Sequence, residues 1–284
     1  MNEHTNDGEM AAALPKFARL PINRCNLPPQ ILGSLTFQRH PTALCLDGVE
    51  ALHGRFFAEL DGIDDALQRA AAFNALMQAA FVLDALDEAG LENRAQRVRR
   101  GNADYLRLLR GWMFDADGQE AAVLKSWVES RFGLVSLSHR GSIRDTGSAQ
   151  YQRYLAARAQ GLYNTNALEA QLDLLYSYCQ YELARRLPQQ QHLTLYRGTN
   201  RIEEYDVLAK PAPHRWIMVL NNLNSFSDDP ERADEFGDIV LLARVPKAKV
   251  LFMPGLLPGT LRGEQEYLVI GGVYETRRNR PGII

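Results

Sequence analysis

The spacing of the apolar residues changes at Pro188, and no other feature of the sequence constrains the fold as strongly. From about residue 48 to Pro188 the apolar residues recur three or four positions apart, as in residues 120–132 and 167–187, which is the spacing of amphipathic helices. After Pro188, short runs rich in Val, Ile, Leu and aromatic residues are separated by Gly, Pro, Asn and Asp, which is typical of strands joined by turns. Strands that are largely segregated from helices predict an α+β fold.

The part of the chain after Pro188 is predicted to be mostly strand. The predicted strands are 192–198, 215–227, 238–246, 249–254 and 266–275. Only residues 229–236 have a helical pattern there, with Asp229 as N-cap and Pro230 at the first helical position. We therefore divide the chain into a flexible N-terminus (1–26), a mainly helical region (27–188) and a β-rich region (189–284).

Composition and motifs exclude several classes of function. A net charge of −2 gives no electrostatic reason to expect binding to nucleic acid or to an anionic membrane. The 3 cysteines and 6 histidines lack metal-ligand spacing, and neither GxGxxG nor GxxxxGK[ST] occurs. The acidic, polar N-terminal segment does not resemble a signal peptide, and no apolar run approaches the roughly 20 residues of a membrane span. We expect a soluble, cytoplasmic protein.

An unusual pair of acidic residues begins the last predicted strand. Side chains at positions i and i+2 of a strand lie on the same face, so Glu264 and Glu266 would place like charges side by side. Such a pair is unfavourable unless a cation lies near it or the pair has a chemical role. The pair follows a loop that Gly and Pro interrupt, formed by Leu257, Pro258, Gly259, Thr260, Leu261, Arg262 and Gly263.

Two further features lie at the ends of predicted strands. Arg197 lies between Tyr196 and Gly198, and an arginine beside a glycine can approach and bind a phosphate closely. Ser225 and Ser227 lie two positions apart before the predicted helix, where their hydroxyls can end a strand or orient a neighbouring carboxylate. Each of these features, taken alone, is more typical of a structural role.

Taken together and in this order, the three features resemble the motif of the arginine-specific mono-ADP-ribosyltransferases. In that motif an arginine on one strand is followed by Ser-x-Ser on a later strand and then by Glu-x-Glu. One difference is Phe226 between the two serines, where many members of the family have Thr. The wider chain resembles the dinitrogenase reductase ADP-ribosyltransferases of nitrogen-fixing bacteria, and the resemblance rests on YLRLLRGW (105–112), AVLKSWVESRFGL (122–134), QLDLLYSYCQ (171–180), HLTLYRGTN (192–200), LNNLNSFSDD (220–229) and EQEYLVIGG (264–272).

The resemblance implies a β-sandwich catalytic core of mixed or antiparallel strands, with NAD+ as substrate and no metal. It implies that Glu266 stabilises the ribose cation, that Ser225 orients Glu266, and that Glu264 binds the acceptor arginine. NAD+ would be bound by Arg197 with Gly198, Tyr196, Ser227, Phe226 and Phe236. Either Phe236 or Phe226 could pack against the nicotinamide, and the loop from Leu257 to Gly263 would recognise the target.

The resemblance also implies what the protein acts on. The expected reaction is transfer of ADP-ribose to one arginine of the nitrogenase iron protein, which switches nitrogenase off in response to ammonium or energy signals. A PII-type signalling protein is the expected regulator, and the helical region is the expected docking surface for target and regulator. Three alternatives stay open: transfer to another protein, hydrolysis of NAD+, and a non-enzymatic interaction module.

Overall fold

The computed structural model describes residues 13–81, 83, 104–161, 165–259 and 265–279. The helices within these ranges are α2 (Pro29–Leu32), α3 (Leu35–Arg39), α4 (Val49–Asp61), α5 (Ala66–Phe81), α7 (Tyr105–Phe114), α8 (Gln119–Phe132), α9 (Ala149–Gly161), α10 (Thr165–Arg186) and α11 (Pro230–Asp234). The strands are β1 (His192–Thr199), β2 (Asp206–Ala212), β3 (Arg215–Phe226), β4 (Ile239–Pro246), β5 (Val250–Phe252) and β6 (Tyr267–Arg278). Single 3-10 turns are formed by η1 (Lys16–Ala18), η2 (Ile202–Glu204) and η3 (Lys247–Lys249).

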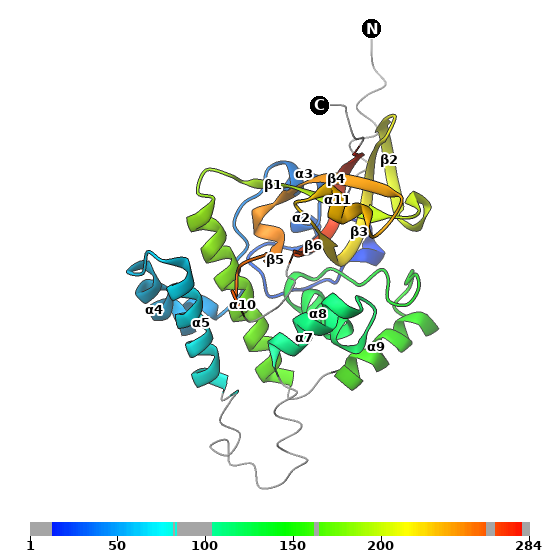
Figure 1. The fold of residues 1–284 in the computed structure, drawn as a ribbon. Helices are drawn as coiled ribbons and strands as arrows, with labels where there is room; N and C mark the ends of the chain where they lie inside the picture. Colours follow the sequence, from blue (N-terminus) through cyan, green and yellow to red (C-terminus); the bar gives the residue numbers. More distant parts are fainter. Residues whose placement is uncertain (1–12, 82, 84–103, 162–164, 260–264, 280–284) are drawn as a thin grey trace.

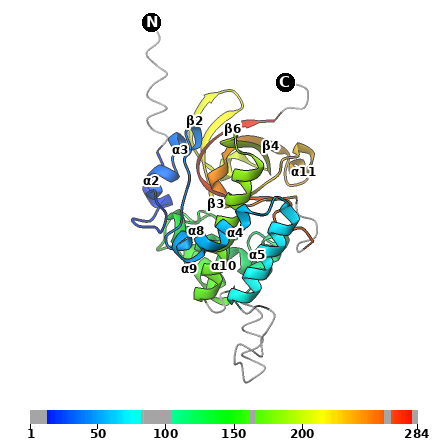
Figure 2. The same cartoon turned by 90° about the vertical axis from the view of Figure 1, so that its left-hand side faces the viewer.

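The predicted α+β class is confirmed. The strands lie toward one end of the protein and helices α5, α7, α8 and α9 toward the other, while α10 runs from the helical end up to the sheet (Figures 1 and 2). All strand pairs among the described residues are antiparallel and belong to one sheet of 6 strands in the order β1-β4-β6-β3-β2, with β5 paired to β6. By hydrogen bonding the core is thus a single sheet rather than the two separate sheets of a sandwich.

Strand β6 is the centre of the sheet. It pairs with β3 from Tyr267 to Arg277, with β5 near its beginning and with β4 at its end. Its residues from Leu268 to Tyr274 are buried. A strand that is buried on both faces reads as a continuous apolar run, which explains why the sequence showed it so clearly.

The sheet curls so that its first strand returns to β3. Tyr196 of β1 and Ser227, just after β3, exchange both backbone hydrogen bonds, with N···O distances of 2.7 Å and 2.8 Å. Because the sheet order places β4 and β6 between β1 and β3, this bridge joins strands that are not neighbours along the sheet. Two predicted strand ends are thereby brought together.

A bulge in β3 joins the sheet to the helical region. The pairing of β3 with β6 shifts between Leu220 and Leu223, so that Asn221 and Asn222 form an irregular segment. A Cβ atom at Gly271 would collide with the carbonyl oxygen of Asn221, so glycine is required opposite this segment.

Both asparagine side chains of the bulge bind backbone of the helical region. Asn221 Oδ1 accepts a hydrogen bond from Leu137 N at 2.8 Å, and Asn222 Nδ2 donates to the carbonyl oxygen of Lys125 at 2.7 Å. Asn222 also donates to the carbonyl oxygen of Leu134 at 3.1 Å. These side-chain hydrogen bonds tie the irregular segment of β3 to the helical region, while the buried Asn222 Oδ1 has no hydrogen-bond partner among the described residues.

Most predicted elements are found close to their predicted positions. Helix α8 ends at Phe132 and α10 at Arg186, and Asp229 caps α11 by accepting a hydrogen bond from Glu231 N at 2.9 Å. The strand β2 was not predicted, because it is an edge strand without regular apolar alternation and contains Pro211, which cannot donate to a ladder.

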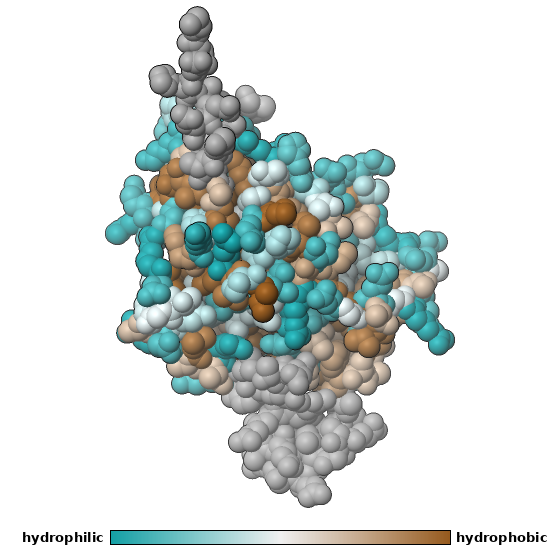
Figure 3. All heavy atoms as spheres, turned by 180° about the vertical axis from the view of Figure 1, so that it is seen from behind, coloured by the Kyte–Doolittle hydropathy of each residue, from teal (hydrophilic) through white to brown (hydrophobic). Residues whose placement is uncertain are grey.

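Seen from behind, hydrophilic and hydrophobic residues are interspersed over the face of the protein (Figure 3). No helix of the described part is long and apolar enough to cross a membrane.

A lysine without exposed surface reaches the central strand β6 from the turn η3. Lys249 has 0% exposure, and its Nζ donates a hydrogen bond to the carbonyl oxygen of Gly271 at 2.6 Å. The same Nζ lies 4.9 Å from the ring centroid of Tyr274 and 5.6 Å from that of Phe37. Burial lowers the pKa of Lys249 to about 7.

We predict that Lys249 makes stability rise with pH. Between about pH 7 and the higher pKa of an unfolded lysine, the unfolded chain binds one proton more than the folded chain, so the free energy of unfolding rises by up to about 1.4 kcal/mol per pH unit. The difference in unfolding free energy between the native protein and Lys249→Met should therefore increase from pH 7 to pH 9 in denaturant titrations. Lys210→Met, at an exposed lysine of β2, is the control. Parallel pH curves for native protein and Lys249→Met would contradict the prediction.

Candidate active site

Three predicted site residues come together where strand ends meet. Arg197 is on β1, Ser225 on β3, and Glu266 directly precedes β6. The β1–β3 bridge at Tyr196 brings Arg197 against β3, and the pairing of β3 with β6 brings Ser225 beside the start of β6. The sheet therefore assembles residues that are far apart in the sequence.

Ser225 is the centre of this cluster. Its Oγ donates a hydrogen bond to Glu266 Oε2 at 3.0 Å, and its carbonyl oxygen accepts one from Arg197 Nη1 at 2.8 Å. Arg197 Nε donates to the hydroxyl of Tyr205 at 3.3 Å. Among the described residues the guanidinium is thus held by two neutral acceptors, and these leave the donors on its Nη2 for an anionic ligand.

Burial raises the pKa of Glu266 above that of an ordinary glutamate. The hydrogen bond from Ser225 and the positive charges of Arg197 and Arg232 act in the opposite direction and favour the carboxylate. The result is a desolvated carboxylate whose orientation is set by a neighbouring hydroxyl. Such a group stabilises a nearby positive charge more strongly than a carboxylate in water does.

Two cavities meet at Arg197 and Ser225. The first, which we call the Glu266 cavity, has a volume of about 400 Å³ and is lined by Glu266, Arg232 and Phe236 as well as by the two shared residues. The second, the Arg144 cavity, has a volume of about 300 Å³. The wall between them also contains Trp112, Asp115 and Ala116 from α7 and the turn after it.

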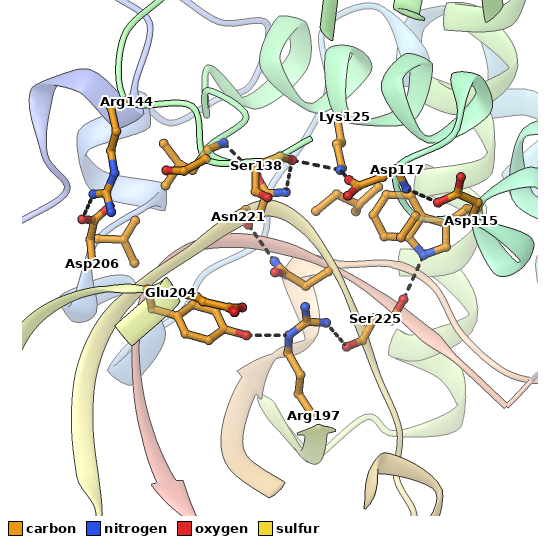
Figure 4. Close-up of a pocket in the computed structure, with 18 residues that line it drawn as sticks. Asp115, Asp117, Lys125, Ser138, Arg144, Arg197, Glu204, Asp206, Asn221 and Ser225 are labelled. Atoms are coloured by element: carbon orange, nitrogen blue, oxygen red, sulfur yellow. Dashed lines mark hydrogen bonds and ion pairs between the residues drawn. The ribbon is translucent and has the colours of Figure 1, made fainter. Parts of the chain in front are cut away.

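The Arg144 cavity is lined mainly by polar and charged groups. Figure 4 shows Arg197 and Ser225 on its strand side and Lys125 with Asp117 on its helix side. Lys125 is buried, and its Nζ donates to Asp117 Oδ1 at 2.9 Å and to the carbonyl oxygen of Ser138 at 3.0 Å. At the far end of this cavity Arg144 forms an ion pair with Asp206 (Figure 4).

The two candidate phenylalanines have different environments. Phe226 is 3% exposed and belongs to the hydrophobic core, whereas Phe236 is 61% exposed. Both line the Glu266 cavity, but only the ring of Phe236 has a surface that a ligand could cover. Because strand side chains alternate, Phe226 points away from the face that carries Ser225.

Three other predicted NAD+-binding residues help to shape the strand ends. A Cβ atom at Gly198 would collide with the carbonyl oxygen of Ala233, so glycine lets α11 pack directly on β1. Ser227 Oγ accepts a hydrogen bond from Asp229 N at 3.0 Å, which turns the chain into α11. Tyr196 forms the strand bridge, and all three residues line the Glu266 cavity.

The predicted recognition loop is described only in part. Leu257 is fully buried, whereas Pro258 and Gly259 are exposed. Within the described part of the loop, only these two residues offer a surface to another protein. Four further residues of this prediction, Thr260, Leu261, Arg262 and Gly263, lie outside the described residues, as does the predicted catalytic residue Glu264.

Several residues of the site were missed by the sequence reasoning, and Trp112 and Lys125 of the helical region are among them. Trp112 of α7 donates a hydrogen bond from Nε1 to Ser225 Oγ at 2.9 Å. Lys125 of α8 lies with Nζ 5.7 Å from the ring centroid of Trp112. Trp112 follows a helical apolar pattern, which indicates only that the side chain is buried.

Within the described ranges, no group of three or more His, Cys, Asp or Glu residues is placed to hold a metal ion.

Comparisons with known proteins show what this chain is similar to. The family model described as dinitrogenase reductase ADP-ribosyltransferase (DRAT) matches residues 22–278. The NAD(+)--dinitrogen-reductase ADP-D-ribosyltransferase of Rhodospirillum rubrum is 39% identical over 254 residues, which cover 89% of this chain and 92% of that protein. No solved structure matches the chain. The resemblance noted in the sequence is confirmed, and the chain belongs to the dinitrogenase reductase ADP-ribosyltransferase family.

Proposed function

We propose that this protein transfers ADP-ribose from NAD+ to one arginine of dinitrogenase reductase, the nitrogenase iron protein, and thereby inactivates nitrogenase. The observation that carries the proposal is the hydrogen bond of 3.0 Å between Ser225 and Glu266 beside Arg197, in a chain of this family. The name of the Rhodospirillum rubrum relative supports both the donor and the target.

The first part of the reaction is cleavage of the bond between nicotinamide N1 and ribose C1′. Nicotinamide leaves with the bonding electron pair and becomes neutral, so no general acid is needed. The ribose develops a positive charge that a preorganised carboxylate stabilises, as in glycoside hydrolysis. Glu266 has this role in the proposal, and Ser225 keeps its carboxylate in position.

Arg197 lies at the boundary of the two cavities, which suits a ligand that extends to both sides of it. We place the nicotinamide and its ribose in the Glu266 cavity and the diphosphate on Arg197, whose Nη2 donors are available. Phe236 then covers the nicotinamide ring. The adenosine half extends toward the Arg144 cavity.

The second part of the reaction is attack on C1′ by a nitrogen of the acceptor arginine. The guanidinium is a poor nucleophile because its pKa is above about 12, so the attacking nitrogen must lose its proton as the new C–N bond forms. A carboxylate that binds the guanidinium can accept this proton. We assign this role to Glu264 from its position two residues before Glu266 in the sequence.

Regulation, docking and location complete the proposal. We propose that a PII-type signalling protein controls the enzyme in response to ammonium or energy supply, and that the protein acts in the cytoplasm with its target. The helical region 27–188 is the proposed docking surface for target and regulator, and residues 189–284 are the proposed catalytic core. These assignments rest on the resemblance to the family.

The two glutamates should differ in what they contribute. Glu266→Gln removes the charge that stabilises the ribose cation, so transfer and NAD+ hydrolysis should both fall by more than about 100-fold. Glu264→Gln should lose arginine transfer and keep a measurable rate of NAD+ hydrolysis. Nicotinamide release and label incorporation into the target measure the two activities. Near-native transfer by both variants would overturn the assignment.

Alanine substitutions at Phe236 and Phe226 should have different effects on NAD+ binding and on stability. Phe236→Ala should raise the KM for NAD+ by about five- to tenfold, since a stacked ring contributes about 1 kcal/mol, and should leave the melting temperature unchanged. Phe226→Ala removes a core side chain and should cost about 3–5 kcal/mol of stability. Steady-state kinetics and thermal unfolding of both variants test this. An unchanged KM in Phe236→Ala would remove Phe236 from the binding site.

The target and its residue can be tested in one experiment. The protein is incubated with NAD+ labelled in the ADP-ribose part and with dinitrogenase reductase, either native or with its acceptor arginine replaced by lysine. Label on the native target alone is expected. Equal label on both forms would contradict arginine specificity, and nicotinamide release without any labelled protein would indicate an NAD+ hydrolase.

A further inference from the structure

A tryptophan from the helical region reaches the catalytic hydroxyl. Trp112 is 3% exposed, and its Nε1 lies 2.9 Å from Ser225 Oγ, to which it donates a hydrogen bond. The two residues are 113 positions apart and belong to α7 and β3. An indole nitrogen can only donate, so the direction of this hydrogen bond is certain from its chemistry.

This contact determines where the proton of Ser225 points. A serine hydroxyl has one hydrogen and two lone pairs. The Trp112 N–H occupies a lone pair, and Glu266 Oε2, at 3.0 Å, accepts the hydrogen. Without the indole donor, the hydroxyl would be free to rotate and to donate elsewhere in the cavity. The hydrogen bond to Glu266 would then be formed only part of the time.

We propose that Trp112 is a positioning residue for the transferase reaction, acting through Ser225 on the carboxylate of Glu266. The proposal rests on the role of Glu266 proposed above. It makes the helical region part of the catalytic apparatus, in addition to any role in docking. Its effect should appear in the chemical step more than in NAD+ binding, because the indole touches Ser225 rather than the carboxylate.

Trp112 is itself held firmly in place. Lys125 Nζ lies 5.7 Å from the centroid of the indole ring, and this buried ammonium group is fixed by Asp117 at 2.9 Å. A cation over the ring face attracts the ring electrostatically. Helix α7 is also tied to α8 by the ion pair of Arg107 and Glu120 at 2.5 Å. The donor therefore has little freedom to move away from Ser225.

The test is a double-mutant cycle between Trp112 and Ser225. Trp112→Phe keeps an aromatic ring and removes the N–H, and should lower kcat for transfer by about five- to tenfold with a change in KM for NAD+ below about twofold. In the Ser225→Ala background the same substitution should change kcat by less than about twofold, because there is no hydroxyl left to orient. Equal losses in both backgrounds would overturn the proposal.

A second variant separates the N–H from packing. Placing β-(3-benzothienyl)alanine at position 112 preserves the shape of the bicyclic ring and replaces the N–H by sulfur. It should reproduce the loss in kcat of Trp112→Phe while the melting temperature stays close to that of the native protein. Native kcat with this side chain would show that only ring packing matters and would overturn the proposal.

The matched control is Trp127 of α8. It is also buried, and its Nε1 donates to Asp173 Oδ1 at 2.8 Å, away from both cavities. Trp127→Phe should change kcat equally in the native and Ser225→Ala backgrounds.

The acid limb of the pH profile of kcat/KM gives an independent readout of the state of Glu266. Loss of the Ser225 hydrogen bond favours the protonated carboxyl, so the limb should move to higher pH in Ser225→Ala and, less far, in Trp112→Phe. It should not move in Trp127→Phe. An acid limb at the native position in Trp112→Phe would contradict the proposal.

The experiments distinguish a wrong role for Glu266 from a wrong role for Trp112. If Glu266→Gln retained native transfer, the catalytic assignment itself would be wrong, whatever the cycle between Trp112 and Ser225 showed. If Glu266→Gln is inactive and the cycle is additive, only the role of Trp112 fails.

Discussion

The candidate active site depends on the closure of β1 onto the end of β3. In the order β1-β4-β6-β3, three inter-strand steps separate the two strands, which would place them about 14 Å apart in a flat sheet. The backbone bridge between Tyr196 and Ser227 removes this separation, and Arg197 Nη1 then lies 2.8 Å from the carbonyl oxygen of Ser225. An arginine and a serine on non-neighbouring strands can thus act on one ligand.

The bulge at Asn221 and Asn222 connects this closure to the helices. A bulge bends a strand and increases its twist, which favours curling of the sheet. The amides of the bulge bind backbone of the helical region, and Gly271 makes room for the displaced chain. The buried Nζ of Lys249 donates to the carbonyl oxygen of the same glycine. One short segment therefore sets both the curvature of the sheet and the position of the helices.

Much of the fold could be predicted from the sequence, because the continuous apolar run of β6 and the helical apolar spacing of α8 indicate buried elements whatever the topology. The motif residues Arg197, Ser225 and Glu266 could be named, and the structure brings them together. The edge strand β2 could not be predicted, since its weak apolar pattern and Pro211 resemble a loop. Trp112 could not be assigned to the site either, because helical spacing predicts burial but not which strand the indole N–H reaches.

Ser225 joins three parts of the protein, and this explains why a serine suits the position. Its backbone carbonyl binds Arg197, and its hydroxyl both accepts from Trp112 and donates to Glu266. Only a group that can donate and accept at one atom can link an indole N–H to a carboxylate. The neighbouring Phe226 belongs to the core, so the hydrogen bonds around Ser225 do not depend on a hydroxyl at that position. The difference from the commoner motif thus affects packing rather than the arrangement around Glu266.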